Sequence, residues 1–291
     1  MKKDIKTTPY LMVLGITQDT GYPQINCSES CCELAWDKTE LKKMVTSLAI
    51  VDPISNQQWI LDATPNITEQ LHLLNKTSGM KNLEGIFITH AHIGHYTGLM
   101  YFGKEGMNTS KTPVFVMPKM KKFIEGNAPW SQLVNSKNIS LNLMKNESFI
   151  QLNERIRITP FLVPHRDDYS ETVGFKIQTK SKSSIFIPDI DKWEIWDRNI
   201  LEEIRAVDYA LIDATFFNGN ELPGRDMADI PHPFVVESMS LFESLIAEDK
   251  AKVWFIHLNH SNPLLNRDSA AYRRVTAQGF KVAREGDRLT L

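Results

Sequence analysis

Three histidines stand within six residues of one another, directly after an apolar run. The run covers residues 85–89, and His90, His92 and His95 follow it. Residues two apart in an extended segment point the same way, so a strand end can aim His90 and His92 at one point while a turn brings His95 back. Neutral imidazole is the commonest metal ligand in proteins, and three imidazoles with an open fourth position are typical of catalytic zinc. The alternative, a loop of surface histidines, explains one such residue better than three.

Other polar residues close further apolar runs along the chain. His165, Asp189 and His257 each stand at or just beyond the end of such a run. Because open α/β sheets place their ligand sites at the carboxyl ends of strands, we expect these side chains to meet the first histidines. Asp191 is a close competitor of Asp189, since the sequence there reads Pro-Asp-Ile-Asp. Solvated loop histidines explain each member alone but explain the series poorly.

The first cluster reads His-Ala-His-Ile-Gly-His. It resembles the His-x-His-x-Asp-His signature of the metallo-β-lactamase superfamily. This resemblance implies a four-layer αββα sandwich of two mixed β-sheets, with one domain over residues 1–291. It also implies a metal cofactor, with Asp189 bridging two ions. The implied metal ligands are His90, His92, His95, His165, Asp189 and His257.

The sequence departs from the signature at Gly94, where the family has an acid that helps to hold a second metal and orients the attacking water. The first metal keeps its imidazoles, which are His90, His92 and either His165 or His95. We expect the second position to be empty or weakly filled, because Asp189 and His257 would be its remaining protein ligands. Asp19, in the turn after the first strand, is our candidate to replace the missing acid.

A later segment resembles the nuclease and phosphodiesterase branches of the same superfamily. There, an acid followed by Ala-Thr-Phe precedes a histidine near the substrate. Here the segment begins with Asp213-Ala-Thr-Phe-Phe and continues to Pro-His232-Pro. The match implies that His232 donates a proton to a leaving group or binds an oxyanion, as histidine chemistry allows. The alternatives are a histidine at a helix start and, for Asp213, a hydrogen-bonding residue at a strand end.

All three cysteines, Cys27, Cys31 and Cys32, fall within six residues. A secreted framework spreads an even number along the chain, so this cluster indicates a reducing compartment and suggests metal binding. The stretch that ends at Cys27 resembles the N-terminus of the pyrroloquinoline quinone biosynthesis protein B group. Related phosphodiesterases of the carbon–phosphorus lyase pathway hold a structural zinc there, which implies a Cys₃His zinc site completed by His260. The alternative is three small buried residues without a metal.

The elements that must position these residues alternate between strands and helices. We expect strands at 10–16, 47–51, 59–63, 85–89, 113–117, 155–161, 172–179, 184–187, 209–212 and 253–256. A helix should begin after Asn66, because Glu69 follows at capping-box spacing. Further helices are expected at 97–108, 119–126, 193–204, 234–248 and 267–278. Two successive sets of strands with attached helices indicate layered α/β structure rather than separate domains.

Composition narrows the class of protein. The 291 residues are 42% hydrophobic, enough to bury a core without disulfides. The 33 basic and 35 acidic residues give a net charge of −2, without the basic excess that nucleic-acid binding usually needs. No apolar run approaches the roughly 18–20 residues of a membrane span, and the run at 10–16 is too short for a signal peptide. We expect a cytoplasmic protein with a small-molecule substrate, without nucleic-acid or membrane partners, and leave a homodimer open.

The leading functional interpretation is a metal-dependent hydrolase of a small phosphodiester, ester or lactone. A metal-activated water would attack, with His232, Asp189 and Asp19 as the catalytic candidates. Zn²⁺ is the expected cofactor, with Mn²⁺ or Fe²⁺ as other occupants of the active site. One alternative is an Fe(II)-dependent oxidative step in cofactor biosynthesis. The other is a binding or carrier protein whose catalysis decayed when the acid at Gly94 was lost.

Overall fold

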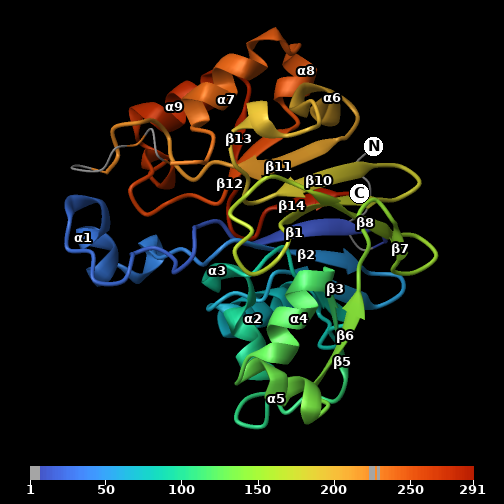
Figure 1. Ribbon diagram of the computed structural model, residues 1–291. Helices are drawn as coiled ribbons and strands as arrows, with labels where there is room; N and C mark the ends of the chain where they lie inside the picture. Colours follow the sequence, from blue (N-terminus) through green and yellow to red (C-terminus); the bar gives the residue numbers. More distant parts are fainter. Residues whose placement is uncertain (1–6, 223–226, 228–229) are drawn as a thin grey trace.

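A computed structural model describes residues 7–222, 227 and 230–291 of the chain. Within them, two β-sheets lie face to face, and helices cover the outer face of each (Figure 1). Both sheets contain parallel and antiparallel pairs. The expected four-layer αββα sandwich of two mixed sheets is therefore confirmed.

The first sheet has seven strands in the order β14-β1-β2-β3-β4-β5-β6. Pairing is antiparallel from β14 to β3 and parallel from β3 to β6. The strands are β1 (Tyr10–Gly15), β2 (Ser47–Asp52), β3 (Gln57–Leu61), β4 (Gly85–Phe87), β5 (Thr112–Val116), β6 (Ile139–Leu143) and β14 (Arg288–Thr290). The last strand of the chain, β14, thus lies at the edge of this sheet and pairs with the first strand, β1.

The second sheet also has seven strands, in the order β13-β12-β11-β10-β9-β8-β7. Here β7 to β10 pair antiparallel and β10 to β13 pair parallel. The strands are β7 (Ile150–Gln151), β8 (Arg157–Leu162), β9 (Val173–Gln178), β10 (Ser183–Ile187), β11 (Tyr209–Asp213), β12 (Val253–Ile256) and β13 (Lys281–Val282). Each sheet therefore has an antiparallel half and a parallel half.

Helices form the two outer layers (Figure 1). The first sheet is covered by α2 (Ile67–Ser78), α4 (Pro118–Gly126) and α5 (Trp130–Asn135). The second is covered by α6 (Ile200–Arg205), α7 (Val235–Leu241), α8 (Ala247–Lys250) and α9 (Ala270–Ala277). Helix α1 (Ser30–Asp37) projects from one side of the sandwich, and the short α3 (Ile93–Tyr96) lies at that side too. None of the helices described is both long and apolar enough to cross a membrane.

Alternating side chains of β1 separate the two parts of the hydrophobic core. Leu11 and Val13 point between the sheets and pack in the cluster that contains Phe175 and Phe186. Met12 and Leu14 point the other way, into the cluster beneath the first sheet. This two-residue period is what a strand buried on both faces requires, and it explains why β1 is continuously apolar.

Several expected helices are shorter or broken in the structure. The segment predicted as a helix at 97–108 is a 3-10 helix over Thr97–Phe102, because Gly98 and Gly106 press against backbone carbonyls. The segments predicted at 193–204 and 234–248 are each divided by a non-helical or 3-10 stretch. The predicted capping box at Asn66 is wrong: its side-chain oxygen accepts a hydrogen bond from Val45 N instead.

Gly98 ties the histidine segment to the end of β3. Its N–H donates to Ala63 O at 2.9 Å, and an added Cβ would lie 2.1 Å from Thr64 O. We expect Gly98→Ala to destabilise the protein by about 3 kcal/mol, at the upper end of ordinary overpacking costs. Urea unfolding followed by circular dichroism would measure the loss.

Gly126 provides the matched control at the end of α4. Nothing lies within 4 Å of a Cβ added there, so Gly126→Ala should be neutral or add up to about 1 kcal/mol. Equal unfolding midpoints for the two variants would contradict the close approach at Gly98.

Candidate metal centre

The polar residues predicted at strand ends meet at one edge of the sandwich. His90 follows β4 by three residues, His165 follows β8 by three, and Asp189 follows β10 by two. His257 comes directly after β12. All four side chains are at least nine-tenths buried. Both sheets therefore contribute to the site, and each contributes through the carboxyl ends of its strands.

The first group of donors is formed by His90, His92, His165 and Asp189. The Nε2 atoms of His90 and His165 each lie 3.2 Å from Asp189 Oδ2. His92 Nδ1 lies 2.9 Å from His90 Nε2 and 3.3 Å from His165 Nε2. Donors arranged tetrahedrally around a zinc ion at its usual nitrogen and oxygen distances are about 3.3 Å apart. The spacing of this group therefore fits one tetrahedral ion.

His95 belongs to a second group, with Asp189 and His257. Its Nε2 lies 3.9 Å from Asp189 Oδ2, and the Nε2 atoms of both His95 and His257 are buried without a hydrogen-bond partner among the described residues. The structure thus adds His95 to Asp189 and His257, the two residues that we expected to remain for a second metal. The short helix α3 carries His95, and His92 directly precedes it. Whether one or two ions bind remains a prediction.

Asp62 and Thr89, which sequence reasoning missed, orient the imidazoles of the first sheet. Asp62 Oδ2 accepts from His95 Nδ1 at 2.8 Å and from the Thr89 hydroxyl at 2.9 Å. Thr89 Oγ1 in turn lies 2.9 Å from His90 Nδ1 and accepts its proton. Both rings thus carry their protons on Nδ1 and direct Nε2 lone pairs toward Asp189. The available signal was an acid at the end of the 59–63 run.

The second sheet repeats this arrangement with Asp213 and Thr215. Asp213 Oδ1 accepts from the Thr215 hydroxyl at 2.7 Å, and Thr215 Oγ1 lies 2.9 Å from His257 Nδ1. Asp213 Oδ2 also accepts from His232 Nδ1 at 2.8 Å. Asp213 is thus a hydrogen-bonding residue at a strand end, and it orients two histidines at once.

Asp189 and Asp191 occupy different positions relative to the histidines. Asp189 is a member of all three groups of possible metal donors in the candidate metal centre, and the residue is only 3% exposed. Asp191 stands behind His165 and accepts from its Nδ1 at 2.9 Å. Both acids of Pro-Asp-Ile-Asp are therefore used, one facing the donors and one supporting a donor from behind.

His232 lies inside the site and is buried. Its Nδ1 is 3.2 Å from Asp189 Oδ1 as well as 2.8 Å from Asp213 Oδ2. Burial lowers the pKa of His232, but the charges of Asp213 and Asp189 outweigh burial and raise it above the ordinary value. The residue thus lies next to the metal-type donors with a pKa shifted in the direction that suits a proton donor.

Burial and neighbouring charges shift the pKa values of the clustered side chains in opposite directions. Burial holds the pKa of His90 well below its ordinary value and lowers the pKa of His257, so both rings are neutral and able to bind a metal. Burial also acts on His165, but Asp189 and Asp191 raise its pKa to about 10. The neighbouring imidazoles hold the pKa of Asp189 well below its usual range despite burial. The carboxylate thus stays charged and attracts a cation.

Asp19 lies directly against Gly94. A Cβ added at Gly94 would be 2.7 Å from Asp19 Cα and 3.0 Å from Asp19 Oδ1. The carboxylate is half-buried, and it does not join His95, Asp189 and His257 in their group of donor atoms within 4.8 Å. The structure thus brings Asp19 to the motif position without placing it among the closest donors.

The three cysteines and His260 form a separate cluster beside α1. Adjacent sulfurs lie 3.8 Å apart between Cys27 and Cys31 and 3.9 Å apart between Cys31 and Cys32. His260 Nδ1 lies 3.6 and 3.4 Å from the sulfurs of Cys31 and Cys32. A zinc tetrahedron with sulfur at about 2.3 Å has sulfur–sulfur edges of about 3.8 Å and sulfur–nitrogen edges of about 3.5 Å. The four donors therefore match a Cys₃His site, and both adjacent cysteines reach it.

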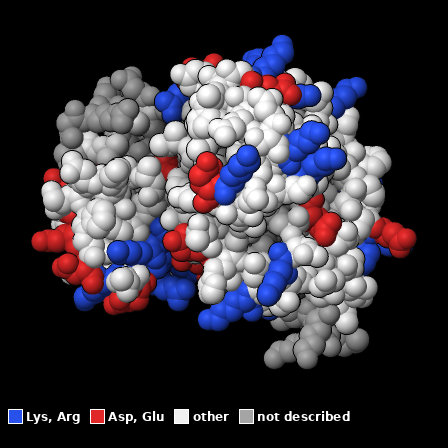
Figure 2. Space-filling view, turned by 90° about the horizontal axis from the view of Figure 1, so that it is seen from below, with Lys and Arg blue, Asp and Glu red and all other residues white. Residues whose placement is uncertain are grey.

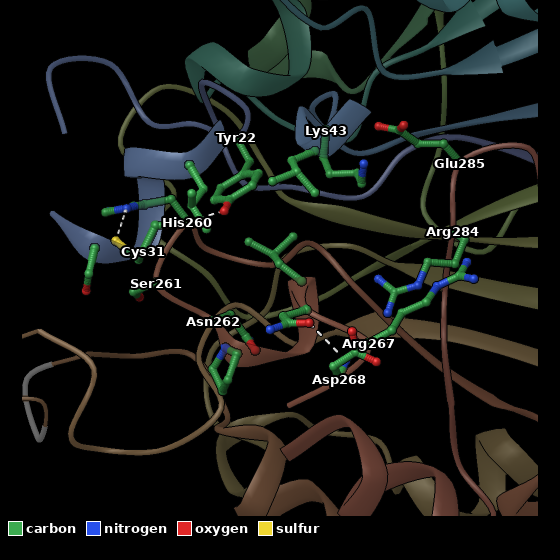
Figure 3. Close-up of a pocket in the computed structure, with 16 residues that line it drawn as sticks. Tyr22, Cys31, Lys43, His260, Ser261, Asn262, Arg267, Asp268, Arg284 and Glu285 are labelled. Atoms are coloured by element: carbon green, nitrogen blue, oxygen red, sulfur yellow. Dashed lines mark hydrogen bonds between the residues drawn. The ribbon is translucent and has the colours of Figure 1, made fainter. Parts of the chain in front are cut away.

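The cysteine cluster borders a cavity of about 670 Å³. Figure 3 shows His260 beside Cys31, with Tyr22 above them and Arg267 and Arg284 across the cavity. The Tyr22 hydroxyl donates to Cys31 O at 2.6 Å. Burial raises the pKa of Cys32 to about 12, so this thiol stays protonated unless a cation balances its charge.

Comparisons with known proteins agree with this geometry. The sequence profile of the β-lactamase superfamily domain matches residues 58–258. The coenzyme PQQ synthesis protein B of Acinetobacter baumannii (strain ACICU) is 26% identical over 97% of this chain and 100% of its own length. The protein of that name from Klebsiella pneumoniae is 25% identical over 97% of this chain and 98% of its own length. The expected resemblance to this group is thus confirmed.

Solved structures share the fold. Zn²⁺-bound PqqB from Methylobacterium extorquens superposes with a TM-score of 0.79 at 21% identity, covering 97% of this chain and 100% of its own. A diphosphatase from the PhnP family gives a TM-score of 0.65 at 20% identity, covering 98% of both chains. Since the family profile spans more than half of the sequence and includes the strand ends that carry the cluster, the chain belongs to the β-lactamase superfamily.

Proposed function

We propose that this protein is a metal-dependent hydrolase that cleaves a phosphodiester, ester or lactone bond in a small molecule. The observation that carries the proposal is the convergence of imidazole nitrogens on Asp189 from both sheets, with supporting hydrogen bonds that turn their lone pairs inward. Such donor sets are typical of catalytic metal sites. Membership of a superfamily that includes hydrolases, and likeness to a diphosphatase, support the choice of hydrolysis.

Zinc is the cofactor that the donor set fits best, in view of its imidazole-rich tetrahedral spacing. When bound, a divalent ion supplies a Lewis acid and lowers the pKa of water. His90, His92 and His165 would hold that ion together with Asp189, and Asp189 is shared with the group of His95 and His257. These assignments follow the distances given above.

His232 would handle the proton that the leaving group needs. Asp213 fixes its Nδ1, so Nε2 is left to contact a substrate. Because neighbouring carboxylates raise the pKa of His232, its protonated form can donate to a departing oxygen or stabilise an oxyanion. The chain thereby supplies a general acid beside the metal position.

A small substrate suits the charge of the surface. On the face shown in Figure 2, basic and acidic side chains lie among one another rather than in separate fields. Polynucleotide binding draws most of its affinity from clustered lysine and arginine. We therefore propose a small molecule as substrate, with no nucleic acid partner.

A second candidate is an Fe(II)-dependent oxidative step in cofactor biosynthesis. It is favoured by the relatives named coenzyme PQQ synthesis protein B, which match nearly the whole chain. Imidazole and carboxylate donors with open positions also suit iron. Elemental analysis after anaerobic purification separates the two: iron with oxygen consumption would favour oxidation, and zinc or manganese would favour hydrolysis.

The cysteine cluster is proposed as a structural zinc site. Its four donors belong to the N-terminal loop and to the loop after β12, so a bound ion would cross-link segments more than 220 residues apart. Closed Cys₃His sites of this kind contribute folding free energy rather than catalysis.

His90→Ala tests the active-site metal. It removes a central donor, so zinc affinity at this position should fall by more than the roughly 100-fold cost of losing a supporting partner. Hydrolysis of bis(4-nitrophenyl) phosphate, or of whichever model ester the wild type cleaves, should become undetectable. Isothermal titration with zinc and a coupled rate assay measure the two effects. His72→Ala, on the exposed face of α2, is the matched control and should change neither.

Asp62→Asn tests the support behind His95 and Thr89. An amide NH₂ cannot accept the His95 Nδ1 proton, while asparagine still tolerates the left-handed backbone at this position (φ 68°). Zinc affinity should fall about 10- to 100-fold with the fold intact. Asp37→Asn, on exposed α1, is the control. An unchanged zinc titration in Asp62→Asn would contradict the orienting role.

Cys27→Ser tests the structural site. Loss of one thiolate should lower the melting temperature by at least about 4 °C, which corresponds to about 2 kcal/mol in a domain of this size. Activity per folded molecule should be retained, and one zinc equivalent should be lost in elemental analysis. Ser28→Ala, at the exposed neighbouring position, should leave all three unchanged. Loss of activity at full stability would instead assign the cysteines to catalysis.

A further inference from the structure

The space at Gly94 is already taken by another part of the chain. A Cβ there would come within 2.7 Å of Asp19 Cα, closer than real Cβ atoms approach backbone atoms, and within a tight 3.1 Å of Asp19 O. The Asp19 carboxylate oxygen lies only 3.0 Å from the same point. A side chain at position 94 would therefore begin in close contact with both the backbone and the carboxylate of Asp19.

The turn that carries Asp19 is held in place by backbone hydrogen bonds. Gln18 N donates to Leu258 O at 2.9 Å, and Leu258 N donates to Ile16 O at 2.8 Å. Gly21 N closes the turn onto Gln18 O at 3.0 Å. Asp19 itself has φ 33°, a left-handed conformation that aspartate tolerates better than most residues. Asp19 is therefore fixed beside the residue that follows His257.

The Asp19 charge acts on one side of the site. It is among the charges that oppose the effect of burial on the pKa of His95 and of His257, after Asp62, Asp189 and Asp213. These are the two imidazoles whose buried Nε2 atoms have no hydrogen-bond partner in the part of the chain described. Asp19 also lies against Gly94, which precedes His95, and beside Leu258, which follows His257, so it stands on the side of the second group of donors.

We propose that Asp19 and Gly94 form an exchanged pair, in which Asp19 supplies from the β1 turn the anionic oxygen that position 94 lacks. Because Asp19 lies outside the compact group of His95, Asp189 and His257, we assign its contact to a water molecule held at that second position. Gly94 is then required by the approach of the Asp19 backbone. Glycine at the motif position accordingly reflects a relocated acid and not a decayed site.

This inference rests on the proposed metal-dependent function and is tested by metal binding. Zinc is titrated into metal-free wild type, Asp19→Asn and the control Asp37→Asn, and bound zinc is counted by elemental analysis. The wild type should show a tight and a weaker active-site equivalent besides the cysteine-site ion. Asp19→Asn should weaken only the weaker equivalent, by about 10- to 100-fold, as loss of an outer hydrogen-bonding partner does.

A reciprocal exchange tests the geometry. Gly94→Asp alone should weaken the second equivalent and lower the unfolding midpoint, because its Cβ displaces the Asp19 turn. The double variant Asp19→Gly/Gly94→Asp returns the acid to position 94 and gives the turn a residue that suits positive φ. It should recover at least part of the second-ion affinity that Asp19→Asn loses.

The outcomes separate this inference from the function beneath it. Absence of any zinc at the His90 group in wild type would overturn both. One tight equivalent only in wild type, or two that Asp19→Asn leaves unchanged, would overturn the exchanged pair and leave the hydrolase proposal standing. A Gly94→Asp variant with unchanged stability and two unchanged equivalents would overturn the steric argument.

Discussion

The carboxylate of Asp189 is the charge around which this edge of the protein is built. It is 3% exposed, and burying an ionised carboxylate is expensive unless cations or hydrogen-bond donors surround it. The two sheets meet that requirement with imidazoles that follow three different strands, β4, β8 and β12, and with His232. Imidazoles crowded this closely repel one another when protonated and cannot all donate to two oxygens. A divalent cation relieves both conflicts, since it accepts the lone pairs and balances the carboxylate.

The supporting hydrogen bonds repeat in the two halves of the fold. In the first sheet Asp62 binds Thr89 and His95, and Thr89 accepts from a further histidine. In the second sheet Asp213 binds Thr215 and His232, and Thr215 again accepts from a further histidine. In each sheet the acid stands at the carboxyl end of a strand, Asp62 directly after β3 and Asp213 as the last residue of β11. One carboxylate per sheet thus fixes the protons of two imidazoles.

The strand ends and their histidines could be predicted because apolar runs and terminal polar residues are local signals. The orienting role of Asp62 could not be predicted in this way. It depends on His95, 33 residues away, and nothing in the spacing relates the two residues. The helix expected at 97–108 failed for a related reason. Its composition permits a helix, but the carbonyl of Thr64 on another segment comes too close for a regular turn at Gly98. Contacts between distant segments, not local propensity, decided these cases.

The cysteine cluster and the metal centre are mechanically connected through one short segment. His257 precedes Leu258 in the sequence and His260 follows it, and the Leu258 backbone bonds to Ile16 and Gln18, the two neighbours of Thr17 after β1. A cross-link between His260 and the cysteines therefore restrains the same loop that carries Asp19 toward His257. An ion bound by the cysteines and His260 would thus order one wall of the candidate metal centre without contacting its donors.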